Sequence, residues 1–257
     1  MRDVEIDPRL YRDWWAVAVG LLVVAGVVVL RATAEFGVTA GIRWSVVAVA
    51  VGLAELGYLR RHLRRNHPEG TSANPYSRLG IANGVTVVRG ACFAALAGFA
   101  VVRPDPAIVW LPAACYGVGV TLDLVDGAIA RGLGRTTVLG EKLDMAFDTL
   151  GFLVAIVVAV AWGRLPVWYL SLALARYAFK FAVAVRERRG LPVRELPPSR
   201  LRRYLAAVQM AFITVALAPL LSATVVHAVA PVVLLPSLVF FARDYLVVTG
   251  RVSAPTG

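Results

Sequence analysis

The sequence predicts an all-α fold, a polytopic membrane helix bundle, and three observations support this. Of the 257 residues, 59% are hydrophobic and only 17% are charged, whereas about a quarter of the residues in soluble domains are charged. The mean hydropathy is +0.71, and several apolar runs approach the roughly 20 residues that a helix needs to cross a bilayer. The net charge of +11 comes mostly from Lys and Arg between these runs. That placement indicates membrane topology, and we expect no nucleic-acid partner.

Eight apolar segments are candidate transmembrane helices. In chain order they are Trp14–Leu30, Trp44–Leu59, Val85–Val102, Ile108–Leu122, Leu143–Trp162, Val167–Val185, Leu205–Leu220 and Thr224–Val248. The fourth is short unless it continues past Asp123, and Pro231 and Pro236 predict a kink in the last. The predicted organisation is a two-helix membrane segment at 1–60, a cytoplasmic linker with room for a surface helix at 61–82, a six-helix core at 83–250 and a tail at 251–257.

The distribution of Lys and Arg predicts the orientation of the helices. With both termini in the cytoplasm, most basic residues fall on the cytoplasmic side, and the external connections hold Arg31, Arg43, Arg103 and Arg164. Because cytoplasmic loops of membrane proteins are enriched in Lys and Arg, we expect a multi-pass protein of the cell (cytoplasmic) membrane. The segment 123–148 then faces the cytoplasm.

Four acidic residues lie in one predicted helical hairpin, in the sequence TLDLVDGAIARGLGRTTVLGEKLDMAFDTLG. Asp123 and Asp126 are three residues apart, and Asp144 and Asp148 are four apart, so each pair lies on one helix face. An antiparallel turn centred near Arg135 sets Asp123 level with Asp148, and Asp126 level with Asp144. The sequence therefore predicts four carboxylates that converge at two depths.

Converging carboxylates in a low-dielectric site repel one another, so they require cations. Oxygen ligands without His or Cys favour Mg²⁺, Mn²⁺ or Ca²⁺. Small residues at Gly127, Ala130 and Gly140 leave the helix surfaces open to a ligand, and Arg131 can bind a phosphate in bidentate fashion. The alternative is that the acids merely pair with nearby basic residues, but solvated surface charges need neither the matched register nor the glycines.

The fixed positions in this segment resemble the signature of the CDP-alcohol phosphotransferase (CDP-alcohol phosphatidyltransferase) family. The pattern is DxxDGxxAR, then eight residues, then GxxxDxxxD, and every fixed position is present between Asp123 and Asp148. A weaker resemblance covers the six-helix core: Asn83, Thr86 and Arg89 are similar to the polar start of its first helix. Where the fifth core helix opens, Ser199-Arg200 replaces the usual Gly-Lys. The two N-terminal helices lie outside the resemblance.

This resemblance implies an integral membrane transferase of phospholipid biosynthesis. Such an enzyme moves a phosphatidyl or archaetidyl group from a CDP-linked lipid donor to a small polar acceptor alcohol and releases CMP. Two divalent ions, Mg²⁺ or Mn²⁺, and a homodimer are implied as well. Carried over to this sequence, the metal ligands are Asp123, Asp126 and Asp144, with Asp148 as general base and further metal ligand. The nucleotide would contact Gly127, Ala130, Arg131, Gly140, Asn83 and Thr86.

Two cations in the sixth apolar segment bear on the acceptor. Arg176 and Lys180 lie four residues apart on one helix face, and charges at membrane depth are costly. One interpretation is that they bind a phosphorylated acceptor, glycerol 3-phosphate or an inositol phosphate. The other is that Lys180 reaches toward the cytoplasm while Arg176 pairs with one of the hairpin acids. Members of the family with phosphorylated acceptors resemble this arrangement, which favours the first interpretation.

Two other classes of protein carry acids in a helical membrane bundle. An intramembrane prenyltransferase holds Mg²⁺ and pyrophosphate with Asp clusters, but those clusters usually lie far apart in the sequence and need no GxxAR. A non-enzymatic cation-coupled transporter would place acids along a path across the membrane, whereas here they gather on one side. Metal-dependent release of CMP from a CDP-lipid separates the three.

Overall fold

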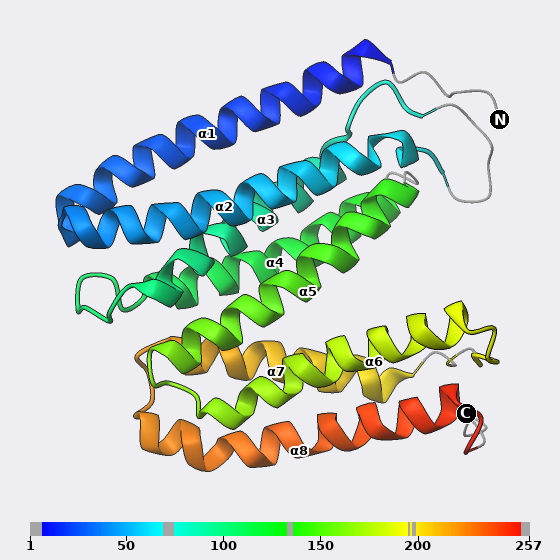
Figure 1. Cartoon of the computed structure of the whole chain (residues 1–257). Helices are drawn as coiled ribbons and strands as arrows, with labels where there is room; N and C mark the ends of the chain where they lie inside the picture. Colours follow the sequence, from blue (N-terminus) through cyan, green and yellow to red (C-terminus); the bar gives the residue numbers. More distant parts are fainter. Residues whose placement is uncertain (1–6, 69–74, 133–135, 195, 197–198, 253–257) are drawn as a thin grey trace. The chain divides into compact units, whose positions relative to one another are not determined.

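The computed structural model describes residues 7–68, 75–132, 136–194, 196 and 199–252, and the side chains of residues 32, 35, 36 and 126–132 fall outside the described set. Within it, the regular elements are all helices, which confirms the predicted all-α fold (Figure 1). The α-helices are α1 (Pro8–Phe36), α2 (Val38–His62), α3 (Ile81–Gly98), α4 (Leu111–Gly132), α5 (Val138–Ala161), α6 (Ser171–Arg188), α7 (Arg200–Leu217) and α8 (Ala223–Val248). Three short 3₁₀ helices are η1 (Leu63–Arg65), η2 (Phe99–Val101) and η3 (Val167–Leu170).

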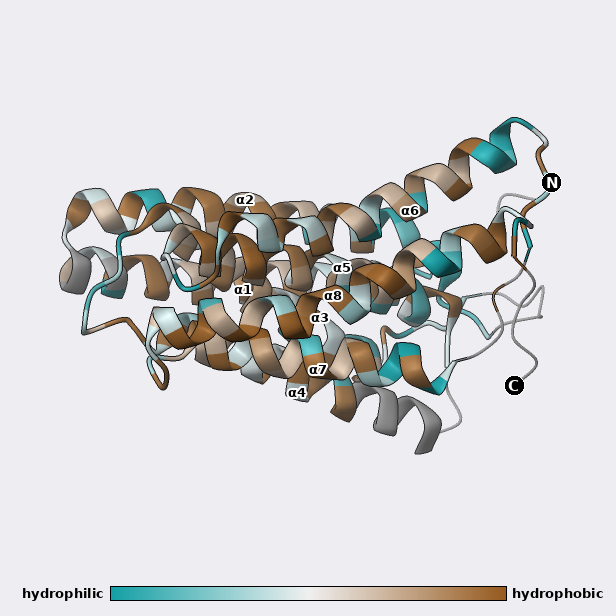
Figure 2. Ribbon diagram, turned by 90° about the horizontal axis from the view of Figure 1, so that it is seen from below, coloured by the Kyte–Doolittle hydropathy of each residue, from teal (hydrophilic) through white to brown (hydrophobic). Residues whose placement is uncertain are grey.

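Among the described residues, six segments are long and apolar enough to cross a membrane. They are Pro8–Arg31, Val38–Arg65, Ile81–Val101, Val138–Ala161, Val167–Arg188 and Ala223–Val248. The apolar part of α4, Leu111–Val125, is shorter, although the helix itself continues past Asp123 to Gly132. Apolar residues cover most of the helices, and hydrophilic residues gather at the end of α6 (Figure 2). The chain is therefore a multi-pass membrane protein.

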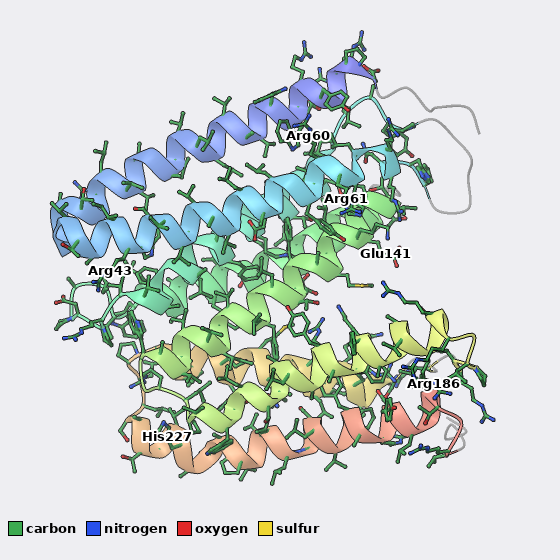
Figure 3. All side chains as sticks on the ribbon, in the orientation of Figure 1. Arg43, Arg60, Arg61, Glu141, Arg186 and His227 are labelled. Carbon is green, nitrogen blue, oxygen red and sulfur yellow. The ribbon has the colours of Figure 1, made fainter. Side chains whose placement is uncertain are left out.

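Basic residues lie near both ends of α2. Arg60 and Arg61 lie in its last turn, and Arg43 lies near its beginning (Figure 3). Cations at the C-terminus of a helix also interact favourably with the helix dipole. The first helix begins at Pro8, before the apolar run, because Asp7 caps it by accepting a hydrogen bond from the backbone N–H of Arg9 at 2.8 Å.

The chain forms two compact units, residues 1–158 and 159–257. In the first unit, α2 packs against α1 and α3, and α3 packs against α4. In the second unit, α8 packs against α6 and α7. Most of α1 is exposed within the structure, as expected of a membrane helix whose outer side contacts lipid.

Polar contacts fix the start of α3. Asn66 is fully buried, and its Nδ2 donates a hydrogen bond to the carbonyl oxygen of Arg78 at 2.8 Å. Asp13 of α1 accepts hydrogen bonds from Arg78 Nη1 at 3.0 Å and from the backbone N–H of Leu79 at 3.2 Å. The segment between α2 and α3 is thus tied to α1, and this holds the first turn of α3 in place.

In the second unit, Gln209 of α7 connects three elements. Its Oε1 accepts a hydrogen bond from the Tyr169 hydroxyl at 2.5 Å, and its Nε2 donates to the carbonyl oxygen of Val233 at 2.8 Å and to Ser237 Oγ at 2.9 Å. Both α8 partners lie beside Pro236, where the missing N–H interrupts the helical hydrogen bonds. Gln209 therefore supports α8, which is continuous through both of its prolines.

Candidate active site

A single buried arginine joins the acidic faces of two helices. The side chain of Arg89, on α3, has no exposed surface. Its Nη1 contacts Asp123 of α4, and its Nη2 contacts Asp144 Oδ1 at 2.6 Å and Asp148 Oδ1 at 3.4 Å, both on α5. Charge-assisted pairs of this kind are short and directional. Three helices of the first unit therefore meet at these four side chains.

The three carboxylates form a compact cluster. One oxygen from each of Asp123, Asp144 and Asp148 lies within 4.8 Å of the others. The side chains are 29%, 47% and 24% exposed, respectively, so a ligand can reach them. One guanidinium cannot balance three carboxylates, and the remaining negative charge favours a cation.

Phe93 sets the spacing of the helices that carry the acids. It lies one turn after Arg89 on α3, and its ring fills the space left by Gly119 of α4 and Gly151 of α5. A Cβ atom at Gly151 would lie 2.6 Å from ring carbons of Phe93, which is too close for a side chain. The two glycines thus allow α4 and α5 to approach α3 closely enough for the acids to meet Arg89.

A second close approach joins α3 to the start of α5. Asn83 Nδ2 donates hydrogen bonds to the carbonyl oxygen of Leu79 at 2.8 Å and to Asn66 Oδ1 at 3.2 Å. A Cβ atom at Gly140 would lie 2.8 Å from Asn83 Oδ1. Thr86 is buried one turn further along α3, with its hydroxyl bonded to the carbonyl oxygen of Ala82 at 3.1 Å. Three of the residues predicted to contact a nucleotide therefore lie in one region of the first unit.

The side chains of four other predicted site residues lie outside the described residues: Asp126, Gly127, Ala130 and Arg131. Their backbone continues α4, with Asp126 one turn after Asp123. Arg176, half-buried, and Lys180, exposed, lie four residues apart on α6 in the second unit. That unit also contains an ion pair between Arg202 Nε and Asp244 Oδ2 at 2.9 Å.

From the sequence, Arg89 was identified as a polar residue at the start of a core helix, and its contacts with the three acids were not predicted. The signal was present, because an arginine inside an apolar helix requires acidic partners. Glu55 was not considered at all, although it is the one acid between Trp44 and Leu59.

Comparison with known proteins identifies the chain's class. No curated protein matches it. The model of the CDP-alcohol phosphatidyltransferase family matches residues 79–250, two thirds of the chain, from two residues before the start of α3 to just beyond α8. Arg89 and the three acids of the cluster lie inside the match, whereas α1 and α2 lie outside it. The chain therefore belongs to the CDP-alcohol phosphatidyltransferase family.

Proposed function

We propose that this protein transfers a phosphatidyl or archaetidyl group from a CDP-linked lipid to a phosphorylated alcohol and releases CMP. The observation that carries the proposal is the convergence of Asp123, Asp144 and Asp148, whose oxygens lie within 4.8 Å of one another. Residues 83–250 would form the catalytic core, with the site at the cytoplasmic face of the cell membrane and the protein as a homodimer.

The residues present fit a site for divalent ions. The donors are carboxylate oxygens, which hard cations such as Mg²⁺ and Mn²⁺ prefer, and their partial exposure leaves room for phosphate oxygens. Asp123, Asp144 and Asp148 would bind the ions together with Asp126. Bound ions would neutralise the diphosphate of the donor and stabilise the leaving CMP.

Asp148 is the proposed general base. It would accept the proton of the acceptor hydroxyl as that oxygen bonds to the phosphorus on the lipid side and the bond from this phosphorus to CMP breaks. Asp148 Oδ1 lies 3.4 Å from Arg89 Nη2, and its side chain is 24% exposed, so an acceptor hydroxyl could reach it.

Arg89 is a positioning residue in this proposal. Its guanidinium contacts acids on both α4 and α5, so it fixes their separation before donor or metal binds. Preorganisation of this kind lowers the cost of assembling charge around the diphosphate. Gly127, Ala130, Arg131, Gly140, Asn83 and Thr86 would contact the nucleotide.

Arg176 and Lys180 would bind the phosphate of the acceptor. Their spacing on α6 supports a shared anionic ligand. We expect Arg176→Ala to raise the KM for a phosphorylated acceptor by about tenfold, the effect of losing one charged hydrogen bond, and to change the KM for the CDP-lipid little. Steady-state kinetics with each substrate varied in turn checks this, with exposed Arg188→Ala on the same helix as a control. A larger effect on the CDP-lipid would contradict the acceptor assignment.

The decisive experiment measures CMP release by purified protein. CDP-diacylglycerol is offered with glycerol 3-phosphate, an inositol phosphate, serine, choline or ethanolamine, in Mg²⁺, Mn²⁺ or a chelator. We expect metal-dependent CMP release with a phosphorylated acceptor. Release of pyrophosphate from a prenyl diphosphate would instead support a prenyltransferase, and no turnover with any pair would oppose an enzymatic role.

A further inference from the structure

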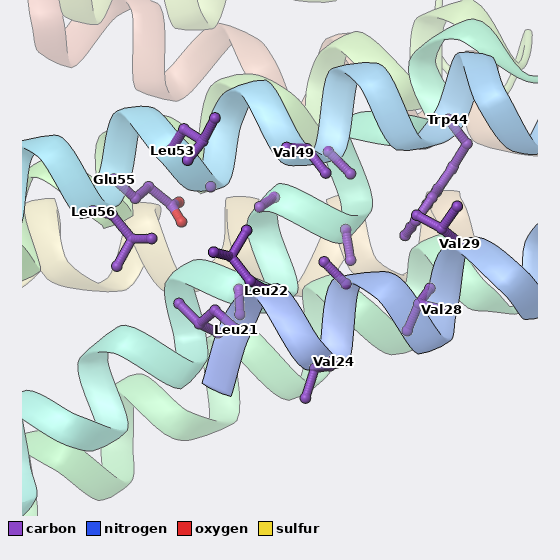
Figure 4. A pocket seen from close by; sticks show the side chains of 16 residues that line it. Leu21, Leu22, Val24, Val28, Val29, Trp44, Val49, Leu53, Glu55 and Leu56 are labelled. Atoms are coloured by element: carbon purple, nitrogen blue, oxygen red, sulfur yellow. The ribbon is translucent and has the colours of Figure 1, made fainter. Parts of the chain in front are cut away.

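An apolar pocket lies between α1, α2 and α3 (Figure 4). It encloses about 690 Å³ of atom-free space, including its open mouth. Its lining is aliphatic except for Glu55 and Trp44. Two of its three helices lie outside the family match, so the common reaction of the family does not explain it.

Glu55 places a carboxyl group at one end of the pocket. The residue is 7% exposed, and its Oε1 has no hydrogen-bond partner within the part of the chain that the structure describes. Its other oxygen faces α3, where a Cβ atom at Gly90 would lie 3.0 Å from it. Figure 4 shows the carboxyl group turned into the space that the pocket side chains surround. A buried carboxyl oxygen without a hydrogen-bond partner is costly, so a donor from outside the chain would stabilise Oε1 of Glu55.

Trp44 lies toward the other end of the pocket. Its ring covers Gly98 and packs edge-on against Phe99, with 5.9 Å between the ring centroids. Trp44 and Glu55 are separated by eleven residues of α2, or roughly 16 Å at 1.5 Å per residue. This is close to the length of one lipid chain, because the hydrocarbon core of two leaflets is about 30 Å thick.

We propose that this pocket binds an alkyl lipid whose hydroxyl group donates a hydrogen bond to Glu55. Its pocket-lining residues include Leu22, Val24 and Leu53, which are more than half exposed, so the occupant would come from the bilayer. The aliphatic walls offer nothing to solvate a charged headgroup. A hydroxyl group needs a single acceptor and supplies the donor that Glu55 lacks.

The test uses a long-chain alcohol that carries a photoreactive diazirine near the end of its chain. The full chain is reconstituted into phosphatidylcholine vesicles with this alcohol or with its methyl ether, which has the same chain but no donor. We expect the alcohol to crosslink to pocket residues about tenfold more than the ether, the effect of one hydrogen bond to a carboxyl group. Equal labelling by the two probes would overturn the proposal, because it would mean that chains enter without recognition at Glu55.

Three variants locate the binding. Glu55→Leu should reduce labelling by the alcohol to the level of the ether. Ala25→Phe places a ring in the pocket from α1 and should abolish labelling by both probes, whereas Val23→Phe, at a 61% exposed position of α1 outside the lining, should change neither. If Ala25→Phe and Val23→Phe behave alike, the label resides on the lipid-facing surface and the proposal fails. The alcohol and ether comparison in the unmodified protein stands even if a variant does not fold.

Discussion

Arg89 of α3 and Glu55 of α2 are buried ionisable residues in the same unit of the protein, but their surroundings differ. Arg89 contacts three carboxylates from α4 and α5. The Oε1 of Glu55 has no hydrogen-bond partner among the described residues and faces an apolar pocket. Both environments have a low dielectric, where an unpaired polar group is expensive. The chain itself supplies partners at the acidic cluster, whereas at the pocket we propose that the hydrogen-bond donor comes from outside the chain.

Replacing Arg89 should have the largest effect on thermal stability. Arg89→Leu leaves three carboxylates close together without their cation. Removing one partner of a fully buried ion pair costs about 3–5 kcal/mol, and the cost here should be lower because the acids are 24–47% exposed. We expect a large fall in thermal stability in detergent. Mg²⁺ should recover more stability in this variant than in the unmodified protein, because a divalent ion can replace the lost positive charge. Equal Mg²⁺ stabilisation of both proteins would argue against a metal site at these acids.

Asp148→Asn tests the role of one acid with little change of shape. If Asp148 accepts the proton of the acceptor, turnover should fall by about 10²–10⁴-fold, the usual contribution of a general base. The protein should remain folded and should still bind the CDP-lipid. Glu141→Gln removes an exposed acid from the first turn of the same helix and should leave CMP release nearly unchanged. Comparable losses in both variants would mean that overall charge, and not Asp148, matters.

The sequence predicted the helices and the convergence of Asp123, Asp144 and Asp148 because both depend on local spacing, whereas the predicted fourth acid, Asp126, lies outside the described side chains. Apolar runs determine where membrane helices form, and the intervals from Asp123 to Asp148 determine which residues share a face. The position of Arg89 depends on how α3 packs against the hairpin, which Phe93, Gly119 and Gly151 govern. The spacing of residues along the chain does not predict that contact. The same holds for the approach of Asn83 to Gly140, which joins segments far apart in the sequence.

The pocket could not be predicted from the sequence, for a related reason. An acid in an apolar run is visible in the sequence, but whether neighbouring helices provide a donor for it is settled by packing. Here α1 and α3 line the pocket beside Glu55 with aliphatic side chains and small residues. A sequence pattern can therefore identify a costly group without showing whether its partner lies inside the chain.

Two glycine positions, Gly151 of α5 and Gly84 of α3, should also differ in their tolerance to added volume. Gly151→Ala forces a methyl group against Phe93, and overpacking of this kind costs about 1–3 kcal/mol. Phe93→Leu in the same chain should restore part of the loss by making room. Gly84→Ala, at a position of α3 with no atom within 4 Å of the added carbon, should be neutral or slightly stabilising. Thermal unfolding of the four proteins measures this, and a harmless Gly151→Ala would show that α5 is not held by the ring.

Glu55→Leu should have a smaller effect than Arg89→Leu and the opposite sign. In detergent without added alcohol, the change replaces a buried carboxyl group that lacks a partner with an apolar side chain of similar size. It should raise stability by about 1–3 kcal/mol, the cost of leaving such a group unsatisfied. With the long-chain alcohol added, the unmodified protein should gain stability through ligand binding and the variant should not, so the gap between them narrows. A loss of stability without alcohol would show that Glu55 already has a partner in the protein, and the contrast with Arg89 would disappear.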